Sequence, residues 1–387
     1  MGSQEVCSGQ SRLFPVCLYN YSHTHVKGIK MQNTTPYLGI IEGFFGRTWS
    51  MQERHDYAGF LQANGYHFYI YAPKADAYLR RSWRQDWPVE TADQLQALVN
   101  HYHSLGLDFG VGLSPFEIYK NYDDSARQQL QDKVERLNHL GVDILCVLFD
   151  DMQGNQPDLA QIQATIVKDV LAQTSAKKVI MCPTYYSFDP RLETLFGVMP
   201  DNYFQDLGRA LPGPVDIFWT GPEICSTDYP QAHMEEAIQV LGRKPFLWDN
   251  YPVNDGADIS RFLFTRAFEN RPDSLAQLTT GHSVNPMNQP WLSRIPLYSL
   301  PLSYSQGQHY DPEKALQEGL MMLCGENLAR QISKDVECFQ NEGLDKINTM
   351  QNKQLIQQYS QYDSPYAKEI IAWLRGEYAF DKECLTG

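Results

Sequence analysis

The sequence predicts a (β/α)8 TIM barrel followed by a small helical C-terminal domain, and three observations lead to this fold class. Short apolar runs alternate with amphipathic stretches from residue 37 onward, the order typical of a parallel sheet with crossover helices. Eight such runs are present, at 37–43, 67–73, 108–115, 143–150, 178–186, 215–222, 244–252 and 278–286. No glycine-rich phosphate loop follows the first run, although an open doubly wound sheet, the structural alternative, usually has one there. We therefore favour a closed barrel over residues 36–305.

Helical segments are predicted between these strands and after them. The amphipathic stretches lie near 50–64, 89–105, 124–139, 157–174, 230–241, 257–270 and 288–298. From residue 308 the chain is rich in Gln, Glu and Lys, with apolar residues at helical spacing, such as Leu316, Leu320, Leu355 and Ile356. Residues 306–387 are therefore predicted to form a helical domain whose apolar stripes serve as packing faces.

The first 35 residues lack the pattern of a folded element. The apolar stretch 13–18 is short, contains Pro15 and has no small-residue cleavage site, so it resembles a secretory signal only weakly. We expect residues 1–35 to be a disordered extension. Alternatively, the start is mis-assigned and Met31 is the true first residue. We also expect a cytoplasmic protein.

Composition and charge argue against several classes of function. The formal net charge is −14 and no long run of Lys or Arg is present, so nucleic acid and anionic membranes are poor partners. No apolar run reaches the ~18 residues that a membrane span needs. The eight Cys contain no C-x-x-C pair and the ten His are scattered, so we expect reduced thiols and no metal site.

Two adjacent carboxylates, Asp150 and Asp151, end the apolar run at 143–150. A carboxylate at the end of a buried strand is costly unless it faces a cavity, a metal or a substrate. One Asp alone would as readily cap the helix predicted from residue 157. A pair at the mouth of so apolar a strand favours chemistry, because paired carboxylates in a cleft can supply one base and one acid, as glycoside hydrolysis requires.

The other predicted strand ends are also polar and aromatic. In a barrel the active site is built from the carboxyl ends of the strands. These ends carry Glu42, Gly43, Lys74, Ser114, Thr184, Tyr186, Trp219, Thr220, Trp248, Asp249, Asn250, Asn254, Asp255 and Asn285. Carboxylates and amides bind hydroxyl groups, and aromatic faces cover the C–H surface of a sugar ring. The strand ends are therefore predicted to converge on one sugar-binding rim.

Seven motifs, taken together and in order, resemble glycoside hydrolase family 84. They are I-E-G-F-F-G-R-x-W at 41–49, Y-A-P-K at 71–74, L-F-D-D at 148–151, C-P-T-x-Y at 182–186, W-T-G-P at 219–222, W-D-N at 248–250 and N-D at 254–255. The resemblance covers about residues 37–300 and implies an O-GlcNAcase or a related, hyaluronidase-like β-N-acetylglucosaminidase. It also implies a retaining mechanism without a metal or other cofactor, in which the 2-acetamido oxygen of the substrate is the nucleophile.

The resemblance assigns roles to individual residues. Asp150 would stay ionised and hold the acetamido N–H, while Asp151 would start protonated, protonate the leaving oxygen and then activate water. By the same match, the sugar would be bound by Gly43, Lys74, Tyr186, Trp248, Asn250, Asp255 and Asn285. Phe45, Thr48 and Tyr185 differ from some relatives, which leaves the aglycone preference open.

Two other functions are kept as alternatives. One is a catalytically silent GlcNAc-binding protein, which would have little reason to keep both Asp150 and Asp151. The other is an ordinary retaining glycosidase with Asp150 as nucleophile, but the ~5–5.5 Å between its two carboxyl groups suits adjacent residues less well. We expect a GlcNAc-containing glycan or glycoconjugate as substrate. Its aglycone, whether a glycosylated Ser or Thr, a glycan fragment, or a cell-wall or hyaluronan oligosaccharide, is not specified.

Overall fold

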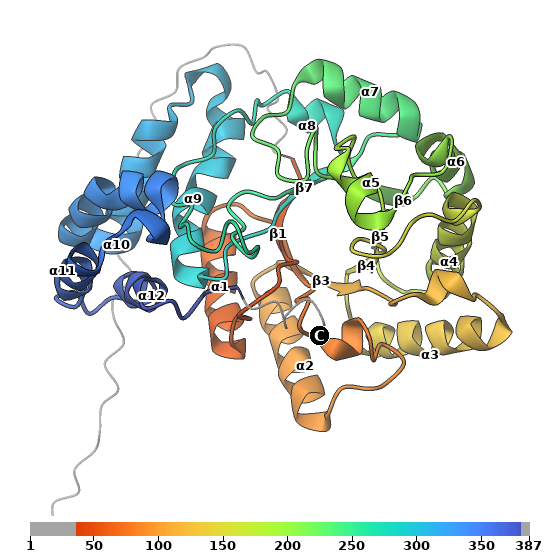
Figure 1. Ribbon diagram of the computed structural model, residues 1–387. Helices are drawn as coiled ribbons and strands as arrows, with labels where there is room; N and C mark the ends of the chain where they lie inside the picture. The colour runs from red at the N-terminus through yellow and green to blue at the C-terminus, as the bar shows by residue number, and fades with distance from the viewer. Residues whose placement is uncertain (1–35, 381–387) are drawn as a thin grey trace, which may run out of the picture. The chain divides into compact units, whose positions relative to one another are not determined.

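The computed structural model describes residues 36–380, in which eight parallel strands form a closed barrel (Figure 1). The strands follow one another around the barrel in chain order, and β1 pairs with β8 to close it. They are β1 (Leu38–Glu42), β2 (Phe68–Tyr71), β3 (Asp108–Leu113), β4 (Ile144–Leu148), β5 (Lys178–Cys182), β6 (Val215–Trp219), β7 (Phe246–Asp249) and β8 (Gly281–Val284). The predicted barrel is confirmed. The extension predicted at 1–35 lies outside the described residues.

The barrel interior is filled by large side chains from several strands. The ring centroids of Phe68 and Phe246 are 5.8 Å apart, although β2 and β7 are not neighbours in the sheet, so both rings point inward. Phe218 of β6 contacts the same cluster, with its centroid 5.5 Å from that of Phe246. Gly39 and Gly281 leave room for these rings, because a Cβ at either position would lie 2.3 Å from a ring carbon.

Helices connect the strands and follow the last one. They are α1 (Met51–Ala63), α2 (Val89–Ser104), α3 (Asp124–Leu140), α4 (Leu159–Gln173), α5 (Arg191–Phe196), α6 (Tyr203–Ala210), α7 (Gln231–Leu241), α8 (Leu275–Leu278) and α9 (Pro290–Gln306), with short 3-10 turns at Ala77–Leu79 and Ile118–Lys120. Local sequence sets their ends. Ser50 and Glu53 form a capping box at the start of α1, and Gly141 ends α3 with a φ of 80°.

The chain after the barrel is helical, as the apolar spacing predicts. It contains α10 (Pro312–Glu337), α11 (Thr349–Tyr359) and α12 (Pro365–Leu374), with shorter turns at Gly307–His309, Cys338–Glu342 and Leu344–Lys346. Their apolar faces share a hydrophobic cluster with residues of the preceding segment, such as Leu263, Met287 and Leu292. The division into domains at residue 305 stays a prediction. Within residues 36–380, no helix combines the length and apolar character needed to cross a membrane.

The predicted helix at 257–270 is wrong. This segment consists of turns and irregular backbone, and the next helix is the short α8. Some of its backbone N–H groups close local turns, and others donate to partners far along the chain. Leu263 N donates to Phe339 O (3.0 Å) and Phe268 N donates to Ser299 Oγ (2.8 Å). Tertiary packing against α9 and the C-terminal segment therefore overrides the local helical pattern. The helices α5 and α6 were not predicted.

Candidate active site

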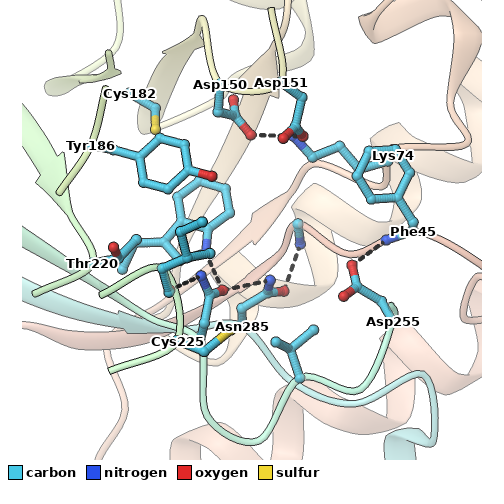
Figure 2. Close-up of a pocket in the computed structure, with 15 residues that line it drawn as sticks. Phe45, Lys74, Asp150, Asp151, Cys182, Tyr186, Thr220, Cys225, Asp255 and Asn285 are labelled. Atoms are coloured by element: carbon cyan, nitrogen blue, oxygen red, sulfur yellow. Dashed lines mark hydrogen bonds and ion pairs between the residues drawn. The ribbon is translucent and has the colours of Figure 1, made fainter. Parts of the chain in front are cut away.

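Asp150 and Asp151 follow β4 and line a pocket at the carboxyl end of the barrel (Figure 2). All five residues of β4 are buried, and Phe149 N continues the sheet by donating to Cys182 O (2.9 Å). Asp151 has a φ of 60°, in the left-handed region that Asp tolerates better than most residues. The chain therefore turns directly after the strand, and two successive side chains reach the same pocket.

Lys74, which follows β2, lies between the two carboxylates. Its Nζ donates a short hydrogen bond to Asp150 Oδ2 and lies 3.0 Å from Asp151 Oδ2. The Lys74 side chain is only 4% exposed, whereas that of Asp151 is 26% exposed. Burial works against the charge of Lys74, but the neighbouring carboxylates outweigh it and raise the pKa of the amine above its usual value. One ammonium group thus faces two carboxylates.

Asp150 is held through one oxygen only. Burial raises the pKa of Asp150, the charge of Lys74 opposes that rise, and the charge of Asp151 adds to it. Its other oxygen, Oδ1, is buried and accepts no hydrogen bond from the described residues. The hydroxyl of Tyr186 points into the same pocket (Figure 2). A ligand N–H that donated to Oδ1 would favour the ionised carboxylate.

The side-chain amide of Asn285 lies across the pocket from the two carboxylates (Figure 2), and it is hydrogen-bonded to the amide of Asn250. Asn285 Oδ1 accepts from Gly43 N (3.2 Å), and Asn285 Nδ2 donates to Asn250 Oδ1 (3.1 Å). Trp248 Nε1 donates to the same Asn250 oxygen (2.9 Å), and Asn250 Nδ2 donates to Ile224 O (2.8 Å). These bonds fix the orientation of both amides, and each amide nitrogen keeps a second N–H for a ligand.

Trp248 forms an aromatic wall that depends on a glycine. A Cβ at Gly43 would lie 2.4 Å from Trp248 Cζ2, closer than real Cβ contacts allow. The indole is 5% exposed and packs against Phe218, with ring centroids 5.1 Å apart. Gly43 therefore serves the pocket by admitting the ring, because its own N–H is already bonded to Ile41 O (2.8 Å) and Asn285.

Asp255 is the third carboxylate of the pocket. Its Oδ2 accepts a hydrogen bond from Phe45 N (2.8 Å), which ties the loop after β1 to the loop after β7. Burial raises the pKa of Asp255 to about 6, against the opposing effect of that N–H, and the charge of Asp151 adds to the rise. Asp255 therefore changes charge close to neutral pH.

All nine site residues predicted from the sequence line this one cavity of about 150 Å³. They come from the ends of β1, β2, β4, β5, β7 and β8. The pocket combines a buried charge cluster, an aromatic wall and fixed hydrogen-bonding groups, an arrangement suited to a small polar ligand such as a sugar. The role of each residue stays a prediction.

A family model described as beta-N-acetylglucosaminidase (NAGidase) matches residues 38–340, a span that includes all eight strands. The chain belongs to glycoside hydrolase family 84. The predicted resemblance is thereby confirmed, and the chain is a member of a family of β-N-acetylglucosaminidases.

Relatives of known identity agree with this family. The Protein O-GlcNAcases of Rattus norvegicus and Mus musculus are each 26% identical over 317 residues, which cover 80% of this chain and 33% of theirs. The chain thus spans about a third of the length of these relatives. Among solved structures, a mutant of Thermobaculum terrenum O-GlcNAc hydrolase is similar, with a TM-score of 0.73 and 30% identity, covering 90% of this chain and 82% of that one.

The family 84 pocket contains further residues that were not among the nine assigned site residues, although Thr220 was named among the polar strand ends. They are Phe45, Cys182, Thr220, Ile224, Cys225 and Val253. Phe45, Cys182 and Thr220 lie inside the strand-end motifs, so their position carried a signal. The other three lie in loops several residues beyond a strand, where an apolar side chain or a lone thiol gives no indication of function.

Several polar strand ends serve the scaffold instead of the pocket, so the predicted convergence is wrong for them. Glu42 forms a buried ion pair with Arg54 of α1 (Nη2···Oε1 2.6 Å) and also accepts from Tyr69. Asp249 forms a buried ion pair with Arg271 (2.8 Å). Successive strand residues point to opposite faces, and the sequence does not show which face a strand end presents to the pocket.

The part of the chain that the structure describes contains no candidate metal site. Across residues 36–380, no set of three or more His, Cys, Asp or Glu side chains is placed to hold a metal ion. The described cysteines are free thiols, at Cys146, Cys182, Cys225, Cys324 and Cys338. Cys7, Cys17 and Cys384 lie outside the described residues.

Proposed function

We propose that this protein is a retaining exo-β-N-acetylglucosaminidase that uses the 2-acetamido group of its substrate as nucleophile. The observation that carries the proposal is the environment of Asp150. One of its oxygens is paired with buried Lys74, and the other is buried without a partner among residues 36–380. An acetamido N–H is a suitable donor for that second oxygen. Membership of family 84 and the likeness to an O-GlcNAc hydrolase support GlcNAc as the sugar.

In the first step, the acetamido carbonyl oxygen attacks the anomeric carbon. The bond from that carbon to the leaving oxygen breaks, and Asp151 donates its proton to the departing oxygen. Positive charge develops on the acetamido nitrogen as the oxazoline ring closes. Asp150 accepts the N–H and offsets this charge, and the hydrogen bond strengthens as the charge grows.

In the second step, Asp151 acts as a base. It takes a proton from a water molecule, whose oxygen attacks the anomeric carbon and opens the oxazoline ring. Ring opening restores the neutral acetamide, whose N–H is still bound by Asp150, and the product is β-GlcNAc because two inversions give net retention. Lys74, bound to both carboxylates, keeps them in place through both steps.

The dimensions and lining of the pocket support action on a terminal sugar. A cavity of about 150 Å³ with buried Lys74, Asn285 and Trp248 in its walls suits one ring rather than the interior of a chain. The substrate in this proposal is therefore a GlcNAc-terminated glycoconjugate.

A series of aryl glycosides tests the mechanism. Their acetamido methyl group carries no fluorine or one, two or three fluorine atoms, which progressively weaken the carbonyl oxygen as a nucleophile. Substrate assistance predicts that kcat falls by orders of magnitude along the series, whereas a nucleophilic Asp150 predicts nearly constant values. The first product seen by NMR should be the β-anomer. Binding of GlcNAc without hydrolysis of the unfluorinated glycoside would establish the silent binding protein instead.

A further inference from the structure

A row of stacked cationic and aromatic side chains leads from the pocket to the surface. It consists, in spatial order, of Lys74, Phe45, Arg80, Phe116 and Arg81, which we call the arginine–phenylalanine row. Lys74 Nζ lies 5.6 Å from the centre of the Phe45 ring, and the Arg80 guanidinium lies 5.5 Å from that same centre. Arg80 and Arg81 lie 5.4 Å and 5.3 Å from the centre of the Phe116 ring. Each contact is within cation–π distance.

The two ends of the arginine–phenylalanine row differ in exposure. Lys74 and Arg80 are buried, Phe45 and Phe116 are half-buried, and Arg81 is exposed. The row therefore connects a lining residue of the pocket with solvent.

The outer end of the row carries a positive charge that no acidic residue of the described chain pairs with. Among residues 36–380, no carboxylate lies within ion-pair distance of Arg81, and Glu117, which follows Phe116 in the chain, pairs with Lys120. This is notable in a chain whose net charge is −14. Because its face contacts Phe116, the Arg81 guanidinium keeps the N–H groups of its edge for a planar anion.

The row lies on the side of the pocket where the proposed reaction releases its leaving group. Asp151, the proposed acid, must lie beside the glycosidic oxygen. Phe45 lies on the same side of the pocket as Asp151, whereas Tyr186 lies on the other side (Figure 2). Asn285, a proposed sugar ligand, lies across the pocket (Figure 2). An aglycone that leaves the pocket past Phe45 meets Phe116 and Arg81 next.

We propose that Phe45, Phe116 and Arg81 form an aglycone subsite that favours an anionic group on the part of the substrate next to the sugar. This inference rests on the proposed function and deepens it. The two phenylalanine rings contact the apolar part of the aglycone, and Arg81 binds its negative group. Since Arg81 is exposed, the preference is modest and is screened by salt.

Two aryl β-N-acetylglucosaminides with leaving groups of matched acidity test the subsite. One releases 3-(4-hydroxyphenyl)propanoate and the other releases the corresponding propanamide, so the charge is separated from the phenol by two methylene groups. At low ionic strength, kcat/KM for the carboxylate should exceed that for the amide roughly two- to fivefold, the range of exposed ion pairs. The ratio should approach one at high salt, and also in Arg81→Gln. Phe116→Leu, which removes the ring beneath Arg81, should lower it as well.

Arg375→Gln is the matched control, because Arg375 is also exposed but follows α12, and it should keep the wild-type ratio. A wild-type ratio of one, or a ratio unchanged in Arg81→Gln, overturns the inference. In both of those outcomes hydrolysis of the amide glycoside still supports the proposed function. Failure of the wild type to hydrolyse either glycoside overturns the proposed function, and the inference with it.

Discussion

At the residue scale, the positive charge of Lys74 stabilises the two adjacent carboxylates, Asp150 and Asp151. A buried carboxylate without a partner costs several kcal/mol, and Asp150 is buried beside a second carboxylate. Lys74 supplies the counter-charge to both. The pair can then divide the proposed roles, with Asp150 holding the acetamido group and the more exposed Asp151 exchanging a proton.

Asp151→Asn removes the proposed acid and base. Substrates with poor leaving groups should lose ~10²–10⁴ in rate, because they need the proton, whereas the first step should be less impaired for activated aryl glycosides. Steady-state and burst kinetics on a pair of such substrates measure this. Azide should partly restore turnover of the activated substrate by replacing the activated water. An equal loss on both leaving-group types would exclude Asp151 as the acid.

Asp150→Asn keeps the volume of the side chain but removes its charge. We expect kcat to fall by orders of magnitude with little change in KM, because the lost interaction grows in the transition state. A thiazoline mimic of the cyclised sugar should bind the wild type far more tightly than GlcNAc does, and this advantage should shrink in the variant. Inhibition constants for both compounds provide the measurement. A covalent sugar adduct on wild-type Asp150 would show that it is the nucleophile.

Asp255→Asn should weaken sugar binding in a pH-dependent manner. A charged acceptor of hydroxyl groups contributes roughly 1.5–3 kcal/mol, so kcat/KM should fall about tenfold or more at pH 7.5. The pKa of Asp255 is raised to about 6, so the carboxylate is charged above that pH and neutral below it. The ratio of wild-type to variant kcat/KM should therefore shrink at pH 5. A collapse of kcat at constant KM would instead give Asp255 a part in the chemistry.

At the scale of elements, the pocket depends on how the ends of β1 and β7 meet. Gly43 follows β1, and Trp248 lies in β7 and occupies the space beside that glycine. The indole N–H in turn orients Asn250 (Nε1···Oδ1 2.9 Å). The absence of a side chain at Gly43 thus allows Trp248 to take its position, and Trp248 in turn orients the amide of Asn250.

Gly43→Ala tests this dependence. The new methyl group would meet Trp248 Cζ2 at 2.4 Å, so the ring must move and its bond to Asn250 should be lost. We expect kcat/KM to fall roughly tenfold to a hundredfold, as small misplacements in active sites do. Gly59→Ala in α1 is the control, since a Cβ there meets nothing within 4 Å, and it should keep full activity. Equal kinetics for the two variants would mean that the wall is not required.

At the scale of the whole described chain, the C-terminal helices are attached to the barrel by a buried carboxylate. Glu369 of α12 accepts hydrogen bonds from Trp291 N (3.0 Å) and Leu292 N (2.8 Å) at the start of α9. Burial raises the pKa of Glu369 to about 8, although these two N–H groups oppose the rise. The side chain of Glu369 thus accepts hydrogen bonds from backbone N–H groups in the first turn of α9, about 77 positions earlier in the chain.

Glu369→Gln should change how stability depends on pH. The pKa of Glu369 is about 8 in the folded protein against an ordinary 4.5, so the folded state binds the proton more tightly and wild-type stability declines as pH rises across that window. Glutamine cannot ionise, but it loses one acceptor oxygen, at a cost of roughly 1 kcal/mol. The variant should therefore be less stable at pH 5 and should approach or exceed the wild type at pH 8.5. Thermal unfolding at both values checks this, and a constant difference would contradict it.

Helix prediction from local pattern succeeded where a helix covers the barrel and failed where the chain serves as a partner for distant segments. The stretch 124–139 has a strong apolar stripe and is α3 in the structure. The stretch 257–270 was also predicted to be a helix, but the N–H groups of Leu263 and Phe268 donate to Phe339 and Ser299. These partners lie 30 or more positions along the chain, and no local signal indicates them.

The sequence by itself determined the barrel, the family and the set of side chains at the strand ends, because strand periodicity and the order of the motifs are local properties. Only the tertiary structure decided which of these side chains share the pocket. It placed Lys74 between Asp150 and Asp151, paired Glu42 with Arg54, and placed Arg81 against the ring of Phe116. The physical reason is that these pairings depend on strand tilt, side-chain direction and loop approach. Each is settled by packing between residues distant in the chain.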